Sequence, residues 1–215
     1  RAPFYDESRH GAVVAEAIAV LRQQGATVVD PADVPNQPLW PVCSGPDQRK
    51  GQDTGCSVVL KYGMKRDFNA WLASLGSSAP VKTLTELRQW NVAHQMAGSI
   101  KYGQAQLDNS DEMNLEVDRA RYAIDREKDL RLSGADGIDA IMKRERLDAL
   151  LFAGSTGAAV AAKPGYPTVI VPFGFVPNAP TPPFPDGFAA RPAPLGISFT
   201  GMACSEPRLI EIAYA

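Results

Sequence analysis

One short segment has the composition of a site for a serine nucleophile. Residues 154–157 read Gly-Ser-Thr-Gly and directly follow residues 148–152, an apolar run typical of a buried β-strand. Reactive side chains are often carried on the loop that leaves such a strand. A serine hydroxyl attacks only when a base within hydrogen-bond reach takes its proton. Lys163 is a candidate base, but nothing in the spacing requires the pairing, and the segment lacks the G-x-S-x-G pattern. The interpretation we favour is a turn of small residues after a strand.

The remaining side chains that can carry chemistry are few and scattered. His10 and His94 are the two histidines, each in a helical context and without an evident partner. Trp71 and Trp90 are predicted to be core aromatics. The chain has no glycine-rich phosphate loop, carboxylate cluster or C-x-x-C pair. The residues by themselves therefore predict no catalytic residue, no metal site and no cofactor.

The three cysteines form an uneven set. Cys43 and Cys56 lie in a segment rich in Pro, Gly and polar residues, where a disulfide would close a loop and contribute about 3 kcal/mol through chain entropy. Two separate thiols are the alternative, and the sequence leaves both open. A bridge would indicate an extracellular protein, and free thiols a cytoplasmic one. Cys204 is predicted to be a small buried packing residue.

Composition excludes some classes of partner. Of the 215 residues, 45% are hydrophobic and 21% are charged, as in an ordinary globular protein. A net charge of −2 gives no electrostatic reason for binding nucleic acid. The apolar runs, such as residues 168–175, are too short to cross a bilayer. We therefore expect neither nucleic acid nor a membrane as a partner. The chain begins with Arg1 and stops within an apolar run, so we expect a fragment.

The pattern of apolar residues predicts the elements that position these groups. Helices are expected at residues 7–24, 58–75 and 111–132, the last with interleaved charges on a solvated face. Strands are expected at residues 26–29, 148–152, 167–172 and 196–200. Residues 30–57 are predicted to form a long irregular loop. Strands that alternate with helices favour an α/β or layered α/β/α fold.

Individual residues mark where several helices begin and end. Thr83 and Glu86 have the spacing of a capping box, and Ser205 is placed to precede a helix that begins at Glu206. Gly25 is placed to end the first helix.

Several segments, taken in order, are similar to one enzyme family. They read Lys-Arg-Asp-Phe-Asn-Ala-Trp-Leu-Ala-Ser-Leu at residues 65–75, Val-Lys-Thr-Leu at 81–84, Asn-Val-Ala-His at 91–94, Lys-Tyr-Gly-Gln at 101–104, Gly-Ile-Asp at 137–139, Leu-Asp-Ala-Leu-Leu at 147–151, Ala-Ala-Lys-Pro-Gly-Tyr-Pro at 161–167, and the strand, turn and helix of residues 194–215. Together they cover most of residues 64–215 and resemble the C-terminal end of the amidase signature family of hydrolases.

The resemblance implies part of an amide-bond hydrolase, with α/β/α layers around a mixed β-sheet. That family is made of serine hydrolases with a Ser–cis-Ser–Lys triad, and its Gly/Ser-rich signature and lysine match nothing in this chain. Residues 1–215 would then be the C-terminal portion of a single domain whose catalytic N-terminal portion is absent. The implied partners are that N-terminal half of the same amidase and a small-molecule amide substrate.

The same resemblance gives a role to the turn after residues 148–152. Gly154, Ser155 and Thr156 occupy the position of a family loop that faces the substrate pocket, so they are candidate substrate-binding residues, and Ser155 does not inherit the nucleophile's role. The family's loop usually carries a proline, which this turn lacks.

Two other functions stay open at this point. One is a non-catalytic scaffold or binding subunit with an amidase-like fold, and the other is an independent hydrolase site made by Ser155 and Lys163. On the amidase interpretation we expect the 215 residues alone to be inactive. The sequence predicts neither the identity of the substrate nor the oligomeric state.

Overall fold

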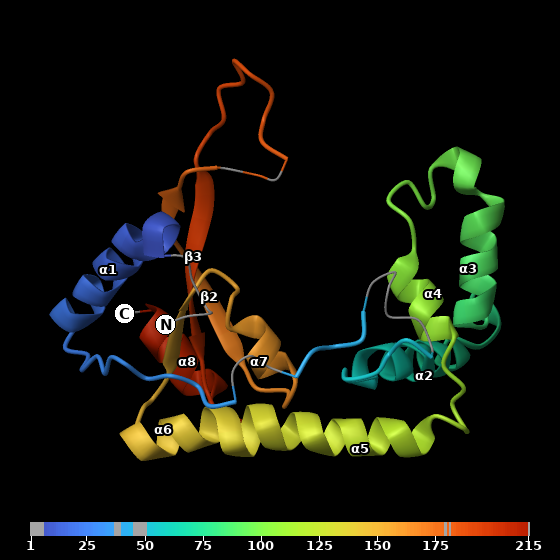
Figure 1. Cartoon of the computed structure of the whole chain (residues 1–215), viewed down its shortest axis with the longest axis horizontal. Coiled ribbons are helices and arrows are strands. Elements are labelled where there is room, and N and C mark those ends of the chain that lie inside the picture. Colours follow the sequence, from blue (N-terminus) through green and yellow to red (C-terminus); the bar gives the residue numbers. More distant parts are fainter. Residues whose placement is uncertain (1–6, 37–39, 45–50, 179, 181, 215) are drawn as a thin grey trace. The chain divides into compact units, whose positions relative to one another are not determined.

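Two compact units make up the chain. The computed structural model describes residues 7–36, 40–44, 51–178, 180 and 182–214. Contacts separate Arg1–Leu39 and Leu130–Ala215, which we call the sheet unit, from Trp40–Asp129, which we call the helical unit (Figure 1). None of the helices formed by the described residues combines the length and the apolar character that crossing a bilayer requires.

The sheet unit is built on one three-stranded sheet. Its strands are β1 (Leu150–Ala153), β2 (Thr168–Val176) and β3 (Ala193–Thr200), in the order β1-β3-β2, and both pairings are antiparallel. The strands predicted at residues 148–152, 167–172 and 196–200 are therefore present. β2 runs further than expected, because a bulge between Pro172 and Gly174 lets it continue past the proline.

Helices cover both faces of this sheet (Figure 1). Leu151 and Ala153 of β1 pack into a cluster with α1 (Glu7–Gln23) and α8 (Glu206–Tyr214). The alternate residues Leu150 and Phe152 pack into a second cluster on the opposite face. That cluster is formed with η3 (Leu130–Ile138), α6 (Asp139–Glu145) and α7 (Ala158–Ala162). The layered α/β/α fold is thus confirmed.

The end of α1 follows the prediction, but the strand after it does not. Gly25 has a φ of +90°, its N–H donates to the carbonyl of Arg22, and Ala26 N–H donates to the carbonyl of Leu21. Residues 26–29 belong to no strand of the described chain, so that prediction is wrong. Although three of these four residues are β-branched, a strand forms only beside a partner, and none of the described strands pairs with them.

Helices dominate the helical unit. They are α2 (Val59–Ser74), η1 (Gly76–Ser78), α3 (Leu84–Ala93), η2 (Gln95–Ala97), α4 (Ala105–Asp111) and α5 (Arg119–Asp129). The N-cap bond of the predicted capping box begins α3, because Glu86 N–H donates to Thr83 Oγ1 over 3.1 Å. The Glu86 carboxylate reaches one residue further back than in a standard capping box and accepts from Lys82 N–H over 2.7 Å.

Cys43 and Cys56 are joined by a disulfide, with their Cα atoms 5.1 Å apart. Both are buried and pack with Val58, Tyr62 and Met113. Around them, Cys43 N–H donates to the Ser57 carbonyl over 2.8 Å, as part of an isolated bridge within the stretch predicted as an irregular loop.

The prediction for Cys204 is wrong. This cysteine is exposed, with a φ of +63°, because it lies in the turn between β3 and α8 and not in a packed layer.

The charged helix begins later than predicted, at Arg119. Just before it, Asn114 Oδ1 accepts from the N–H groups of Glu116 and Val117, and Asp118 Oδ2 accepts from Asn114 N–H. These side-chain bonds to the backbone compete with a helix and form a turn in its place.

One side of α5 is buried, which the prediction of a solvated face missed. Asp125 accepts from Val58 N–H over 3.0 Å and from Arg121 Nε over 2.8 Å. Asp129 accepts from Ser57 Oγ over 2.6 Å. The two carboxylates thus lie at the two residues that precede α2, and Asp125 supplies an acceptor for the backbone N–H of its N-cap residue, Val58.

Trp71 and Trp90 were predicted as core residues, and this is wrong within the described chain. Their side chains are 55% and 48% exposed. Both lie on helix faces that no described element covers, which is why their apolar character misled the prediction.

Candidate functional site

The turn that follows β1 is held by a small set of hydrogen bonds. Gly154, with a φ of +59°, donates its N–H to the carbonyl of Gly196 over 2.7 Å. Thr156 Oγ1 donates to the carbonyl of Ala153 over 2.8 Å, and the Ser198 hydroxyl donates to the carbonyl of Gly154. The turn is therefore fixed to β3 and to the end of β1.

The predicted site residues are displayed on this turn. Ser155 and Thr156 are exposed, and no hydrogen bond among the described residues uses the Ser155 hydroxyl. Ser155 precedes α7 and Lys163 follows it, so the two residues lie at opposite ends of that helix. The turn is accessible to a ligand, and the described residues show no base engaged with its serine.

Neither histidine lies near the turn in the sequence. His10 lies within α1. His94 ends α3 in the helical unit, where it is exposed, and its ring stacks on Trp90 with a 4.0 Å centroid separation. Its Nδ1 also lies 2.8 Å from the carbonyl oxygen of Trp90, a partner within the same helix that the sequence did not make evident.

Tyr166, which precedes β2, packs against the cluster formed with η3, α6 and α7. Burial, with a further contribution from the Asp139 carboxylate, raises the pKa of Tyr166 to about 12. The phenol therefore keeps its proton at neutral pH and is unsuited to act as a base there.

Gly157 ends the turn, and substituting it tests how closely the turn packs against Phe152. A Cβ at this position would lie 2.4 Å from Cδ2 of the Phe152 ring. Because its φ of −79° suits any residue, the effect of Gly157→Ala is purely steric. We expect the free energy of unfolding to fall by about 2 kcal/mol, measured by thermal unfolding followed by far-UV circular dichroism.

The control is Gly63→Ala in the middle of α2. A Cβ there meets only Asp67 Oδ2, at 3.9 Å, so we expect this variant to be more stable by about 1 kcal/mol. An unchanged unfolding temperature for Gly157→Ala would show that Phe152 does not fill the space behind the turn.

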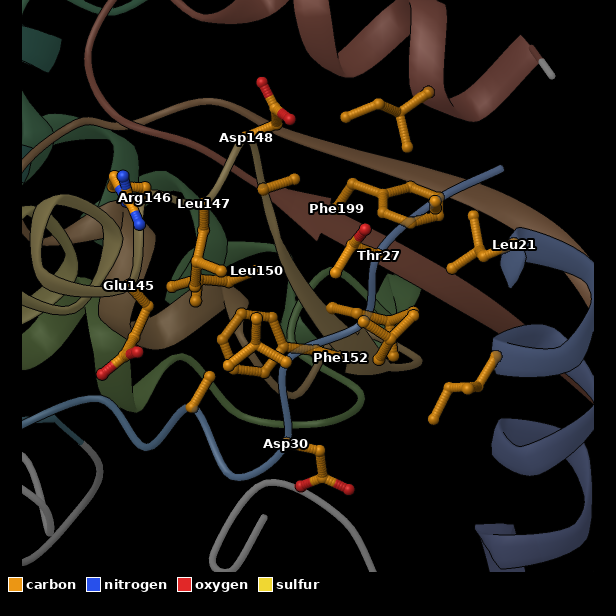
Figure 2. Close-up of a pocket in the computed structure, with 18 of the residues that line it drawn as sticks. Leu21, Thr27, Asp30, Glu145, Arg146, Leu147, Asp148, Leu150, Phe152 and Phe199 are labelled. Atoms are coloured by element: carbon orange, nitrogen blue, oxygen red, sulfur yellow. The ribbon is translucent and has the colours of Figure 1, made fainter. Parts of the chain in front are cut away.

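A cavity of about 650 Å³ runs along the edge of β1 within the sheet unit (Figure 2). Its walls come from the inner side of α1, the segment after α1, the residues before and within β1, and parts of β3 and α8. The lining residues are Val14, Ile18, Leu21, Gly25, Ala26, Thr27, Val28, Val29, Asp30, Ala32, Asp33, Val34, Glu145, Arg146, Leu147, Asp148, Ala149, Leu150, Leu151, Phe152, Ala153, Phe199, Arg208 and Ile212. Gly154, Ser155 and Thr156 are not among them.

The centre of this cavity is apolar and its ends are charged. Figure 2 shows Leu21 and Phe199 close to Thr27, with the ring of Phe152 on the side of Leu150. Asp148, by contrast, lies at one end and pairs with Arg208 over 3.3 Å on the exposed side. In the described part of the chain, no group of acidic, histidine or cysteine side chains is arranged to hold a metal ion. The middle of the cavity thus suits an apolar group, and charged side chains lie at its ends.

Sequence reasoning did not find this cavity. The sequence feature that could have indicated it is the β-branched segment at residues 27–29, which the sequence analysis predicts as part of an ordinary strand. That segment instead forms an unpaired wall of the cavity.

Comparison with known proteins places these features in context. No family model matches the chain. A probable amidase of Arabidopsis thaliana is 29% identical over 208 residues, which is 96% of this chain and 36% of the relative. A crystal structure of the peptide amidase PAM in complex with the competitive inhibitor chymostatin matches with a TM-score of 0.74 and 28% identity, over 100% of this chain and 41% of that one.

Native peptide amidase from Stenotrophomonas maltophilia matches with a TM-score of 0.69 and 29% identity, over 95% of this chain and 38% of that one. The chain thus spans about two fifths of the length of the proteins it matches. The likeness extends over nearly all of this chain and covers both its sequence and its fold. The resemblance to amidases found in the sequence is confirmed: over nearly all of its length the chain is similar to a probable amidase and to peptide amidases.

Proposed function

We propose that this chain is the C-terminal portion of an amide-bond hydrolase. The observation that carries the proposal is a match over nearly the whole chain to proteins named as amidases, of which it spans only about two fifths. When a chain aligns over its whole length with part of a longer enzyme, the simplest explanation is that it is the equivalent part of a similar enzyme. The complete protein would then act on amide C–N bonds, and its substrate would be a small-molecule or peptide amide.

In this proposal the chain supplies framework and one wall of the substrate site. The Ser–cis-Ser–Lys triad belongs to the N-terminal half of the same amidase, which is the chain's partner. Gly154, Ser155 and Thr156 line the pocket from the exposed turn after β1. The fixed backbone and accessible side chains of that turn support this role.

We predict that the 215 residues alone release no ammonia from benzamide or from a short peptide amide. The same residues joined to the remaining amidase sequence should hydrolyse at least one of them. In that complete protein, Ser155→Ala should change kcat/KM by no more than about 10-fold, because Ser155 contacts the substrate without attacking it. Loss of a true nucleophile costs about 10⁵-fold or more.

Two results would contradict this assignment. Turnover by the 215 residues alone that is abolished by Ser155→Ala would show an independent site in this chain. A complete protein that folds but hydrolyses no amide, despite carrying the Gly/Ser-rich signature and its lysine, would favour a scaffold or binding subunit.

A further inference from the structure

An exposed isoleucine of β2 lies on the same face of the sheet as Phe152 of β1. The register pairs Ile170 of β2 with Ser198 of β3, and it pairs Ser198 in turn with Phe152. Residues opposite each other on neighbouring strands share a face of the sheet. Ile170 and Phe152 are therefore on one face, with Ser198 between them.

The helices that cover this face over β1 do not extend over β2. The cluster formed with η3, α6 and α7 contains Leu150 and Phe152, and among the described residues it takes in none from β2. Thr168, Ile170 and Pro172, which alternate onto this face, are all exposed, and Ile170 is 53% exposed. In the described chain, this part of the face is open.

The side chain of Ile170 extends from β2 toward the turn after β1. A Cβ built on Gly196 would lie 2.7 Å from Cγ1 and 2.9 Å from Cδ1 of Ile170. The longer arm of Ile170 thus runs from its partner Ser198 to the level of Gly196, two residues away on β3. Gly196 accepts the N–H of Gly154 over 2.7 Å, so the end of that arm lies one strand away from the turn.

Gly196 is a glycine because of the space above it. It lies within β3 without a positive φ, so its backbone conformation does not require glycine. A side chain there would collide with Ile170, and also with the carbonyl oxygen of Val171 at 2.9 Å. Glycine inside a strand often marks a place where another group approaches closely. Here it lets the arm of Ile170 lie flat across β3 beside the turn.

The surface next to the turn is apolar. We call Gly154, Gly196, Ile170 and Pro172 the apolar floor. The hydroxyl groups on the same face are engaged within the chain: Ser198 donates to the carbonyl of Gly154, and the Oγ1 atoms of Thr168 and Thr200 lie 2.8 Å apart. The apolar floor therefore suits a hydrocarbon group and not a charged one.

We propose that the apolar floor binds an apolar side chain of the amide substrate, so that Ile170 determines specificity in the complete enzyme. The inference rests on the proposed function, in which Ser155 and its neighbours contact the substrate. A substrate group that passes this turn and lies over Gly196 would bury the exposed arm of Ile170. The preferred substrates are thus amides of residues with large apolar side chains, such as phenylalanine.

The test compares two substrates in the complete protein, N-acetylglycinamide and N-acetylphenylalaninamide. Because each methylene bound in an apolar pocket is worth about 10-fold or more, we expect kcat/KM to favour the phenylalanine amide by about 100-fold. Ile170→Thr keeps the β-branched shape but replaces Cγ1 with oxygen and removes Cδ1, the two atoms that lie over Gly196. This variant should lower the preference about 10-fold and leave kcat/KM for the glycine amide within about 2-fold of the wild type.

The matched control is Ile210→Thr. Ile210 is 58% exposed and belongs to α8, which packs on the opposite face of the sheet. The same substitution at a similarly exposed isoleucine should leave the preference unchanged. Ile170→Val, which removes only Cδ1, should give an intermediate preference, and it decides the question if Ile170→Thr does not fold.

The outcomes separate this inference from the proposed function. An active enzyme whose preference is unchanged by Ile170→Thr overturns the role of Ile170, and a lower urea midpoint in that variant would show that Ile170 packs against the rest of the amidase instead. A complete protein that hydrolyses no amide contradicts the proposed function. Calorimetric titration with N-acetylphenylalaninamide then tests the apolar floor by itself: about 10-fold weaker binding to Ile170→Thr supports it, and equal binding or none overturns it.

Discussion

Replacing Asp125 with alanine is expected to lower the free energy of unfolding of the helical unit by about 3 kcal/mol. The Asp125 side chain is only 4% exposed and accepts hydrogen bonds from Val58 N–H and Arg121 Nε. Its removal leaves a backbone donor at the start of α2 without an acceptor and a guanidinium without its carboxylate. An unsatisfied buried donor alone costs about 1–3 kcal/mol.

The matched control is Glu127→Ala on the exposed side of the same helix. We expect it to change stability by less than about 0.5 kcal/mol. All three tryptophans of the chain, Trp40, Trp71 and Trp90, lie in the helical unit, so urea unfolding followed by tryptophan fluorescence reports on that unit. Equal midpoints for the two variants would show that Asp125 does not anchor α2.

Local signals were predicted well because their causes lie within a few residues. The end of α1 at Gly25 needs only a residue that tolerates a positive φ. The capping box of Thr83 and Glu86 needs only two side chains three positions apart. The disulfide between Cys43 and Cys56 was one of two alternatives, and the fold chooses between them by placing both residues beside Val58 and Tyr62.

Buried carboxylates were not predictable from the same information. Asp125 and Asp129 lie four apart among the interleaved charges of α5, a pattern that fits a solvated helix equally well. That side of α5 is buried only because Ser57 and Val58, about seventy residues earlier in the chain, donate hydrogen bonds to these carboxylates. Nothing local to α5 signals it.

The candidate site divides in the same way. The turn at residues 154–157 was predictable, because small residues directly after an apolar strand indicate a turn from the local sequence alone. The cavity beside β1 was not predictable, because the β-branched residues Thr27, Val28 and Val29 predict a strand but do not indicate which segment would pair with it. The strand prediction failed because none of the described strands pairs with residues 26–29.

Asp111→Asn is expected to destabilise the helical unit by about 3 kcal/mol at neutral pH. Asp111 is 6% exposed and joins three helices: its carboxylate accepts from Thr85 Oγ1 over 2.7 Å and Arg88 Nη1 over 2.5 Å, and pairs with Lys65 Nζ at 3.2 Å. An asparagine of the same shape presents an amide N–H₂ to those donors and leaves both cations less well compensated. Urea unfolding followed by tryptophan fluorescence measures the loss.

The pH dependence of this loss identifies its electrostatic origin. Burial acts to raise the pKa of Asp111, but hydrogen bonds from Thr85, Arg88 and Lys65 outweigh it and hold the pKa below its usual value of 3.8. The folded state therefore binds the proton less readily than the unfolded state. The stabilisation is complete above the unfolded pKa and is lost as the pH falls through the folded one. The difference between wild type and Asp111→Asn should thus be largest above about pH 5 and shrink steadily below about pH 4.

Asp67 provides the control for this argument, because its pKa is also lowered, by Arg66, while its side chain is 66% exposed. Exposed ion pairs contribute little, since water screens them and both side chains lose freedom. Asp67→Asn should leave the unfolding midpoint close to that of the wild type at every pH. If Asp111→Asn behaved in the same way, or if its effect grew as the pH fell, the carboxylate would not hold α2, α3 and α4 together through its charge. A loss confined to Asp111 and to the pH range above its pKa would show that burial of the acid, together with three donors from two neighbouring helices, determines the stability of this unit.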